Sequence, residues 1–153
     1  MKLQRFVNVV AIVVGGGSGI GAATVRRLSA EGARVWVADL NPDDAHVVAA
    51  GVDGAMPVLV DVGSVALIDE MLRQIHSTGA RPDVLVNCVG LPLPGGIHET
   101  DDHTWERSLH INLTGTFRTC RAILPSMMER GRGAVVNVAS GAALVADAGF
   151  SVG

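Results

Sequence analysis

The feature that most constrains the fold is a glycine cluster near the amino terminus, Gly15-Gly16-Gly17-Ser18-Gly19-Ile20-Gly21. It follows the apolar run Val7–Val14 and opens an amphipathic stretch, Ile20–Glu31, with helical periodicity. Glycines permit positive φ angles and let backbone N–H groups approach a diphosphate at the positive end of a helix. A triphosphate-binding P-loop would end in Gly-Lys-Ser/Thr, and no lysine stands there. The cluster therefore predicts a strand, a dinucleotide-binding loop and a helix, with a turn that only packs helix against strand as the alternative.

Apolar β-branched runs alternate with amphipathic stretches along the rest of the chain. The expected strands are Val7–Val14, Arg34–Ala38, Ala55–Val60, Asp83–Cys88 and Ala134–Ala139. The expected helices are Ile20–Glu31, Pro42–Ala50, a helix capped by Ser64 that runs to about Ser77, and Asp102–Arg130. This alternation predicts an α/β fold, a Rossmann-type doubly wound parallel sheet with right-handed crossovers. The strand order would be 3-2-1-4-5, with ligands at the switch between strands 1 and 4.

The long helix at Asp102–Arg130 carries apolar residues at helical spacing, which predicts one buried stripe. The residues of this stripe are Leu109, Leu113, Phe117, Leu124 and Met128. Pro125 lies inside the helix and is expected to kink its last part, because proline removes a backbone donor and clashes with the preceding turn.

Composition excludes several classes of protein. The net charge of −3 and the lack of a basic stretch argue against a nucleic-acid partner, and no apolar stretch is long enough for a membrane span. Cys88 and Cys120 lack metal spacing and are expected to be buried free thiols of a cytoplasmic protein. The acids and histidines of 98–103 fit helix capping by Thr100 or Asp101 better than a metal site, so no metal is expected.

Two carboxylates follow expected strands. Asp39 ends the second strand, 18 residues beyond Gly21. A carboxylate there can accept hydrogen bonds from both hydroxyls of an adenosine ribose and would repel a 2′-phosphate, which favours NAD over NADP. Asp61 follows the third strand and is expected either to meet an adenine amino group or to cap the helix after Ser64.

Motifs in a fixed order along nearly the whole chain resemble those of the short-chain dehydrogenase/reductase family. Gly15, Gly19 and Gly21 fit its Gly-x-x-x-Gly-x-Gly spacing. The further matches are Asp61-Val62, Asn87-Cys88-Val89-Gly90, Trp105, Ile111-Asn112-Leu113, Gly115, Phe117, Pro125, Gly133 and Val135-Val136-Asn137-Val138-Ala139-Ser140. Val14 stands where that family usually has threonine, and Cys88-Val89 stands where it has Asn-Ala.

The resemblance implies residue roles. Asn112 would hold a water in a proton relay, and Ser140 would hydrogen-bond the carbonyl or hydroxyl of the substrate. Judged without the resemblance, Asn112 fits an amide that bonds a neighbouring loop, and Ser140 fits a hydroxyl in a turn. The implied cofactor-binding residues are Gly15, Gly17, Ser18, Gly19, Ile20, Gly21, Asp39, Leu40, Asp61, Val62, Asn87, Val89 and Gly90.

The tyrosine and lysine that complete such a site are missing from these residues. The chain has no tyrosine, its only lysine is Lys2, and the tyrosine is expected at or just beyond Gly153. Residues 1–153 are therefore interpreted as an NAD-binding Rossmann domain that is incomplete at its C-terminal end, after about five strands. With strand 5 as an unpaired edge, we expect a marginal, oligomeric or aggregation-prone product.

Three functions remain open from the sequence. The favoured one is the amino-terminal portion of an NAD-dependent oxidoreductase that transfers hydride between nicotinamide and an alcohol or ketone, inactive by itself and expected to form a homo-oligomer. The second is a non-catalytic dinucleotide-binding or partner-regulating module that associates with an intact relative. The third is an S-adenosylmethionine-dependent methyltransferase, which the Asn112 and Ser140 pattern disfavours.

Overall fold

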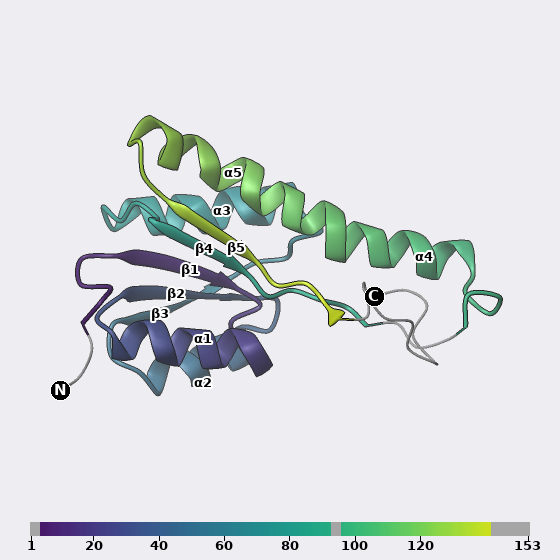
Figure 1. Cartoon of the computed structure of the whole chain (residues 1–153), viewed down its shortest axis with the longest axis horizontal. Coiled ribbons are helices and arrows are strands. Elements are labelled where there is room, and N and C mark those ends of the chain that lie inside the picture. The colour runs from purple at the N-terminus through teal and green to yellow at the C-terminus, as the bar shows by residue number, and fades with distance from the viewer. Residues whose placement is uncertain (1–3, 93–95, 142–153) are drawn as a thin grey trace.

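The computed structural model describes residues 4–92 and 96–141, which form one five-stranded sheet with helices on both faces (Figure 1). All paired strands are parallel, and their order β3-β2-β1-β4-β5 confirms the predicted topology. The strands are β1 (Val10–Val14), β2 (Arg34–Asp39), β3 (Ala55–Leu59), β4 (Val84–Asn87) and β5 (Ala134–Asn137).

The helices form two layers (Figure 1). One face of the sheet carries α1 (Gly19–Ala30) and α2 (Pro42–Ala50). The other carries α3 (Val65–Ser77) and a long helical segment, which consists of α4 (Asp102–Ser108), the π-helix η1 (Leu109–Gly115) and α5 (Thr116–Glu129). No helix in the described part of the chain is long and apolar enough to cross a membrane.

Successive residues of β1 point into two separate cores, as side chains of a strand alternate between faces. Val13 packs in the core under α1 and α2, whereas Ile12 packs in the core under α3 and α5. Both residues are fully buried, as is most of β2. Both faces of the sheet are covered, and this explains why the sequences of the central strands are continuous apolar runs.

The first strand begins at Val10, three residues later than predicted. Asn8 adopts a positive φ of 65°, and the Val9 N–H donates to the carbonyl of Phe6 at 3.0 Å. This turn interrupts the apolar run that begins at Val7. The apolar residues on both sides of Asn8 hide the turn from a prediction based on apolar runs, although asparagine tolerates a positive φ.

The predicted buried stripe of the long helix is wrong. Its five residues are among the exposed large hydrophobics, and their exposed fractions run from 37% to 75%: Leu109, Leu113, Phe117, Leu124 and Met128. The helix instead turns a face with several small or polar residues toward the sheet: Ser108, Gly115, Thr119, Ile123 and Met127. A Cβ at Gly115 would lie 2.6 Å from Cγ2 of Val62, so close approach to the β3–α3 turn selects a glycine where apolarity predicts a large side chain.

The long helical segment is irregular before Pro125. α5 continues past Pro125 to Glu129, whereas residues Leu109–Gly115 form the π-helix. β5 lies at the edge of the sheet, and Val136 and Val138 are exposed there as expected.

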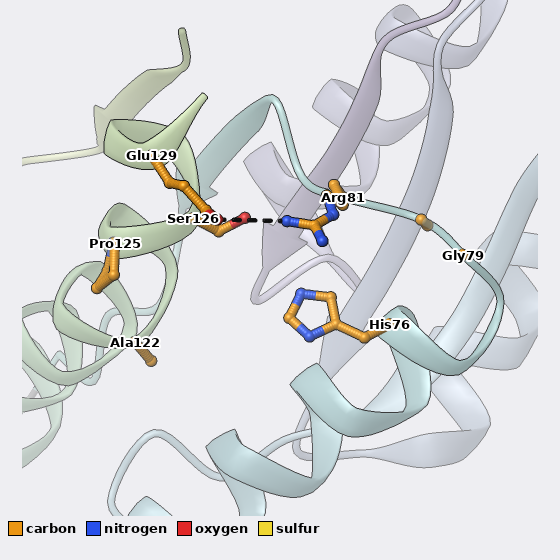
Figure 2. Close-up of a pocket in the computed structure, with 8 residues that line it drawn as sticks. His76, Gly79, Arg81, Ala122, Pro125, Ser126 and Glu129 are labelled. Carbon is orange, nitrogen blue, oxygen red and sulfur yellow. Dashed lines mark hydrogen bonds and ion pairs between the residues drawn. The ribbon is translucent and has the colours of Figure 1, made fainter. Parts of the chain in front are cut away.

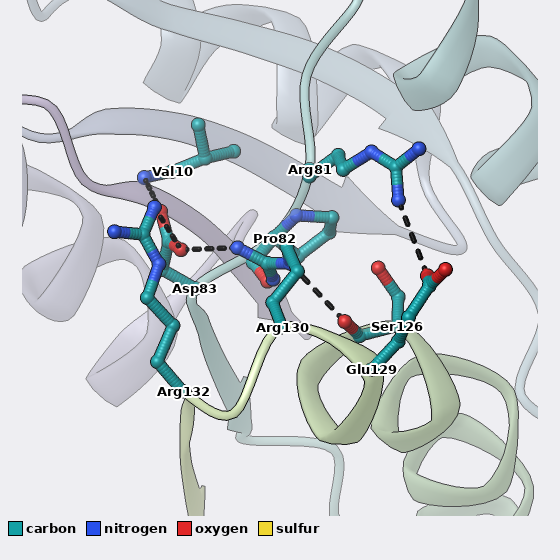
Figure 3. A network of polar contacts seen from close by, with 8 residues as sticks. All are labelled: Val10, Arg81, Pro82, Asp83, Ser126, Glu129, Arg130 and Arg132. Carbon is teal, nitrogen blue, oxygen red and sulfur yellow. Dashed lines mark hydrogen bonds and ion pairs between the residues drawn. The ribbon is translucent and has the colours of Figure 1, made fainter.

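A carboxylate joins three elements at the edge where the strands begin (Figure 3). Asp83 accepts hydrogen bonds from the backbone N–H of Val10 at 3.1 Å and from Arg130 at 2.6 Å, and Arg132 lies 3.2 Å away. Burial opposes ionisation of Asp83, but these partners outweigh it and hold the pKa of its carboxyl below the ordinary value. The network ties β1, the start of β4 and the segment after α5 together.

Glu31 anchors the end of α1 in the same way. Its side chain is buried, pairs with Arg5 and Arg27, and its carbonyl accepts the N–H of Phe6 at 3.0 Å. The hydrogen bond from Arg5 is the largest cause that lowers the pKa of Glu31 from 4.5 to about 2. Because the folded pKa is depressed, these contacts stabilise the fold above pH 4.5, and the stabilisation is lost as the pH falls toward 2.

We therefore expect the free energy of unfolding to fall between pH 4.5 and pH 2, and to fall less steeply in Glu31→Gln. Urea unfolding at several pH values measures this slope. The control is Glu129→Gln, because Glu129 is exposed and forms one ion pair, at 3.5 Å to Arg81. Equal slopes in wild type and Glu31→Gln would contradict the assignment.

Candidate nucleotide-binding site

The glycine loop turns tightly from β1 into α1. Gly15 and Gly19 have φ angles of 76° and 49°, in the left-handed region that glycine tolerates. The N–H groups of Gly15 and Gly16 both donate to the carbonyl of Ala38 in β2, at 2.8 and 3.1 Å. A Cβ at Gly21 would lie 1.9 Å from the carbonyl oxygen of Gly15, so the helix can approach the loop only without a side chain there.

The start of α1 suits an anion. Ser18 is the N-cap residue, but its side chain accepts no capping hydrogen bond, and the first turn contains no acidic residue. The first N–H that bonds back into the helix is that of Ala22, which donates to Ser18 at 2.9 Å. The preceding helical N–H groups and the positive end of the helix dipole can therefore meet a phosphate, as a nicotinamide dinucleotide requires.

Asp39 lies at the end of β2 and faces this loop. Its Oδ2 accepts the N–H of Gly17 at 2.8 Å, and its Oδ1 accepts the N–H of Asn41 at 3.0 Å. Each carboxylate oxygen keeps further acceptor capacity, so ribose hydroxyls can still bind. Leu40, which follows Asp39, is 65% exposed and offers an apolar surface beside the carboxylate.

Asp61 and Val62 form the turn between β3 and α3. Oδ1 of Asp61 accepts the N–H of Gly63 at 2.7 Å, a bond within the turn that lies before α3 and does not cap the helix. Val62 is buried against Gly115. Ser64 caps α3 as predicted, because its Oγ accepts the N–H of Leu67 at 3.3 Å.

Two residues that the sequence did not single out hold this turn from the long helical segment. Nη1 of Arg118 donates to the carbonyl of Gly63 at 2.6 Å, and Nε2 of His110 lies 3.2 Å from the same oxygen. No local motif marks either residue. Only the packing of η1 and α5 on the β3–α3 turn brings them there.

The side chain of Asn87 forms its hydrogen bonds inside the fold. Its side chain is buried, accepts the hydroxyl of Thr119 at 2.8 Å and donates to Oδ1 of Asn137 at 2.9 Å. A contact with a nucleotide would therefore come from the following main chain at Val89 and Gly90.

The main chain at Cys88 and Val89 packs against the glycine loop, 3.0 and 3.1 Å from the position that a Cβ of Gly15 would take.

Cys88 and Cys120 are free thiols, and both are half-buried rather than buried. Burial raises the pKa of the Cys88 thiol.

Asn112 lies within the π-helix η1 and holds the loop after β4. Its Oδ1 accepts the N–H of Leu91 at 2.7 Å, and its Nδ2 donates to the Leu91 carbonyl at 3.2 Å and to Oγ of Ser108 at 3.1 Å. This is the loop-bonding role that the amide suggests without the family resemblance. A π-helical turn is frequent at functional sites, so the position remains compatible with a catalytic role.

Ser140 follows β5, at the edge where the glycine loop follows β1. In the register of β4 and β5 Asn87 pairs with Asn137, and the N–H of Val138 donates to the carbonyl of Asn87 at 2.9 Å. The glycine loop, the loop after β4 and Ser140 therefore share the carboxyl edge of the sheet, where ligands of such sheets bind.

Other features of the described residues lie away from this edge or serve the fold. Asp101 caps α4 by accepting the N–H of Thr104 at 2.7 Å, as predicted, and within 4–92 and 96–141 no group of three potential metal ligands gathers. An open cleft of about 840 Å³ lies between α5 and the end of α3, lined by residues that include His76, Arg81 and Glu129 (Figure 2). Arg81 precedes β4, which places this cleft at the opposite edge of the sheet from the glycine loop.

Comparison with known proteins shows the family to which the chain is similar. The family model described as short chain dehydrogenase matches residues 9–152. The D-threitol dehydrogenase of Mycolicibacterium smegmatis is 38% identical over 141 residues, which cover 90% of this chain and 54% of that enzyme. The 2,3-dihydro-2,3-dihydroxybenzoate dehydrogenase of Bacillus subtilis is 35% identical over 147 residues, which cover 94% and 56% of the two chains.

The crystal structure of gox2181 superposes with a TM-score of 0.89 at 33% identity, and the match covers 94% of this chain and 58% of that chain. The chain thus spans a little more than half the length of these relatives.

We expect Gly21→Ala to lower the free energy of unfolding by about 1–3 kcal/mol, because its Cβ must force α1 away from the carbonyl of Gly15. Nucleotide binding should be lost with the loop geometry. Gly51→Ala is the control, since a Cβ there meets only ordinary contacts at 3.6 Å and φ is −84°. Urea unfolding compares the two variants; equal losses of stability would refute the close-approach argument.

For Asn112→Ala we expect faster hydrogen exchange at the amide of Leu91, because its acceptor is removed. Asn112→Asp is the graded control: it keeps an acceptor for Leu91 N–H and loses only the donated bonds. Exchange measured by NMR should therefore be fast in the alanine variant and slow in the aspartate variant. Similar exchange rates in both variants would contradict the role of Oδ1.

Proposed function

The chain belongs to the short-chain dehydrogenase family, and we propose that the carboxyl edge of its sheet is the cofactor-binding side of an oxidoreductase. This enzyme would transfer hydride between nicotinamide and an alcohol or ketone. One observation carries the proposal. The glycine loop with Asp39, the loop held by Asn112, and Ser140 all follow carboxyl ends of parallel strands at one edge of the sheet. Residues 1–153 on this view are the NAD-binding part of a longer Rossmann domain.

The family implies a nicotinamide cofactor, and we propose NAD rather than NADP. When bound, the nicotinamide would accept or donate the hydride. The loop N–H groups and the start of α1 would hold its diphosphate, and Asp39 would accept the ribose hydroxyls and repel a 2′-phosphate. The turn at Asp61 and Val62, together with Leu40, would border the adenine.

On the substrate side, Ser140 would hydrogen-bond the reacting oxygen and Asn112 would hold a water in the proton relay. An alcohol substrate is consistent with the names of the relatives, D-threitol dehydrogenase and 2,3-dihydro-2,3-dihydroxybenzoate dehydrogenase. The Tyr/Lys pair that exchanges the substrate proton is not among these residues, which contain no tyrosine and only Lys2. These 153 residues would therefore bind nucleotide with little or no turnover, in a cytoplasmic protein that forms homo-oligomers or associates with an intact relative.

A second candidate is a dinucleotide-binding module that regulates a partner without catalysis, because the nucleotide-binding motifs by themselves do not require turnover. Family membership gives no support to the methyltransferase interpretation. Sequencing of the native transcript past the codon for Gly153 separates the first two. A continuation that encodes Tyr-x-x-x-Lys, in frame or after a frameshift, would support the oxidoreductase, and a reproducible stop codon would support the module.

We expect the purified protein to bind NAD and Asp39→Asn to bind it roughly tenfold more weakly, because a charge-assisted acceptor becomes a neutral one. The substitution keeps one oxygen that can accept the N–H of Gly17, so the loop should stay folded. Isothermal titration calorimetry measures both affinities, with unfolding midpoints as a check on the fold. Unchanged affinity in the variant would remove Asp39 from the site.

A further inference from the structure

A second carboxylate lies against the peptide that Asp39 contacts. A Cβ built on Gly17 would lie 2.8 Å from Oδ2 of Asp39 and 2.9 Å from Cβ of Asp44. Asp44 belongs to the first turn of α2 and is exposed. Gly17 therefore lies against two acids, one at the end of β2 and one in the first turn of α2.

Asn41 fixes both acids in place. Its backbone N–H donates to Oδ1 of Asp39 at 3.0 Å, and its Nδ2 donates to Oδ2 of Asp44 at 2.7 Å. Its own Oδ1 caps α2 by accepting the N–H of Asp43 at 3.0 Å. One residue thus bonds both carboxylates, the first through its backbone N–H and the second through its side-chain amide.

No cation offsets these charges locally. From Val35 to Leu72 the sequence contains seven acidic residues and neither lysine nor arginine. Among the described residues, no arginine or histidine forms an ion pair with Asp39 or Asp44. His46, on the next turn of α2, directs Nδ1 to the carbonyl of Pro42 at 2.7 Å.

From this geometry we propose that Asp44 is a second specificity-determining residue of the nucleotide site, which acts with Asp39 to reject a dinucleotide that carries a phosphate on its adenosine ribose. The inference rests on the proposed function, since it assigns the adenosine end of NAD to the edge beside Gly17. Asp44 acts through its charge and needs no contact with the ligand.

The position of Asp44 also has a purely structural explanation. An acid in the first turn stabilises a helix through its dipole, and Asp43 and Asp44 both serve α2 in this way. Of these two acids, Asp44 is the one that lies against Gly17 and whose carboxylate accepts a hydrogen bond from the side chain of Asn41; Asp43 meets Asn41 through its backbone N–H. Asp43 is therefore a matched control with the same charge, the same helix turn and nearly the same sequence position.

The test measures the affinities of the purified protein for ADP-ribose and for 2′-phospho-ADP-ribose by calorimetry, at low and at high salt. These probes report the adenosine end without the nicotinamide. In Asp44→Asn we expect the preference for the unphosphorylated probe to fall roughly three- to tenfold at low salt, and less at high salt because exposed charges are screened. Asp44→Lys should lower it further, and Asp43→Asn should leave it nearly unchanged.

The outcomes separate the two proposals. If wild type binds ADP-ribose and Asp44→Asn leaves the preference unchanged, or Asp43→Asn lowers it equally, the role of Asp44 is overturned and the proposed function stands. If folded wild type binds neither probe nor NAD, the nucleotide site itself is wrong, and the inference falls with it. A selective loss of preference in the Asp44 variants supports the inference.

Discussion

The first turn of α1 approaches the preceding loop so closely that a Cβ at Gly21 would lie 1.9 Å from the carbonyl oxygen of Gly15. Two other features depend on this contact. It directs the start of α1, and with it the unbonded N–H groups, toward the carboxyl edge of the sheet. It also sets the path of Gly17, whose N–H then reaches Asp39 at 2.8 Å. The proposed anion site and the proposed ribose acceptor therefore depend on one packing constraint.

The acidic side chains at the two edges of the sheet have different kinds of partners. Where the strands begin, buried or half-buried acids are paired: Glu31 with Arg5 and Arg27, and Asp83 with Arg130. At the opposite edge, the hydrogen bonds that Asp39 accepts within the described part of the chain come from backbone N–H groups. The acids that hold the fold together are thus neutralised by arginines, whereas Asp39 keeps its charge and acceptor capacity available to a ligand.

The sequence predicted the strand order, because strict alternation of strands and helices implies a doubly wound parallel sheet, and it predicted that the glycine cluster lies between β1 and α1 and that Asp39 ends β2, because these placements depend on local patterns. The sequence prediction was wrong where contacts between residues far apart in the sequence determine the structure. Gly115 and Thr119 face the sheet because one must approach Val62 and the other must bond Asn87, and neither need is visible in apolar periodicity. Arg118 was missed for the same reason, since its partner is the carbonyl of Gly63, 55 residues away.

The candidate site has two parts, the glycine loop with Asp39 and the pair Asn112 and Ser140, and different elements hold them in place. The nucleotide half is held by contacts among β1, α1, β2 and α2, such as the bonds of Gly15 and Gly16 to Ala38. Asn112 and Ser140 depend instead on η1, β4 and the edge strand β5, whose Val136 is 51% exposed. Local opening is easiest where few buried contacts hold an element. Loss of order at β5 would therefore disturb the placement of Ser140 before it reached the glycine loop and Asp39, so the two parts of the candidate site differ in how far they depend on that strand.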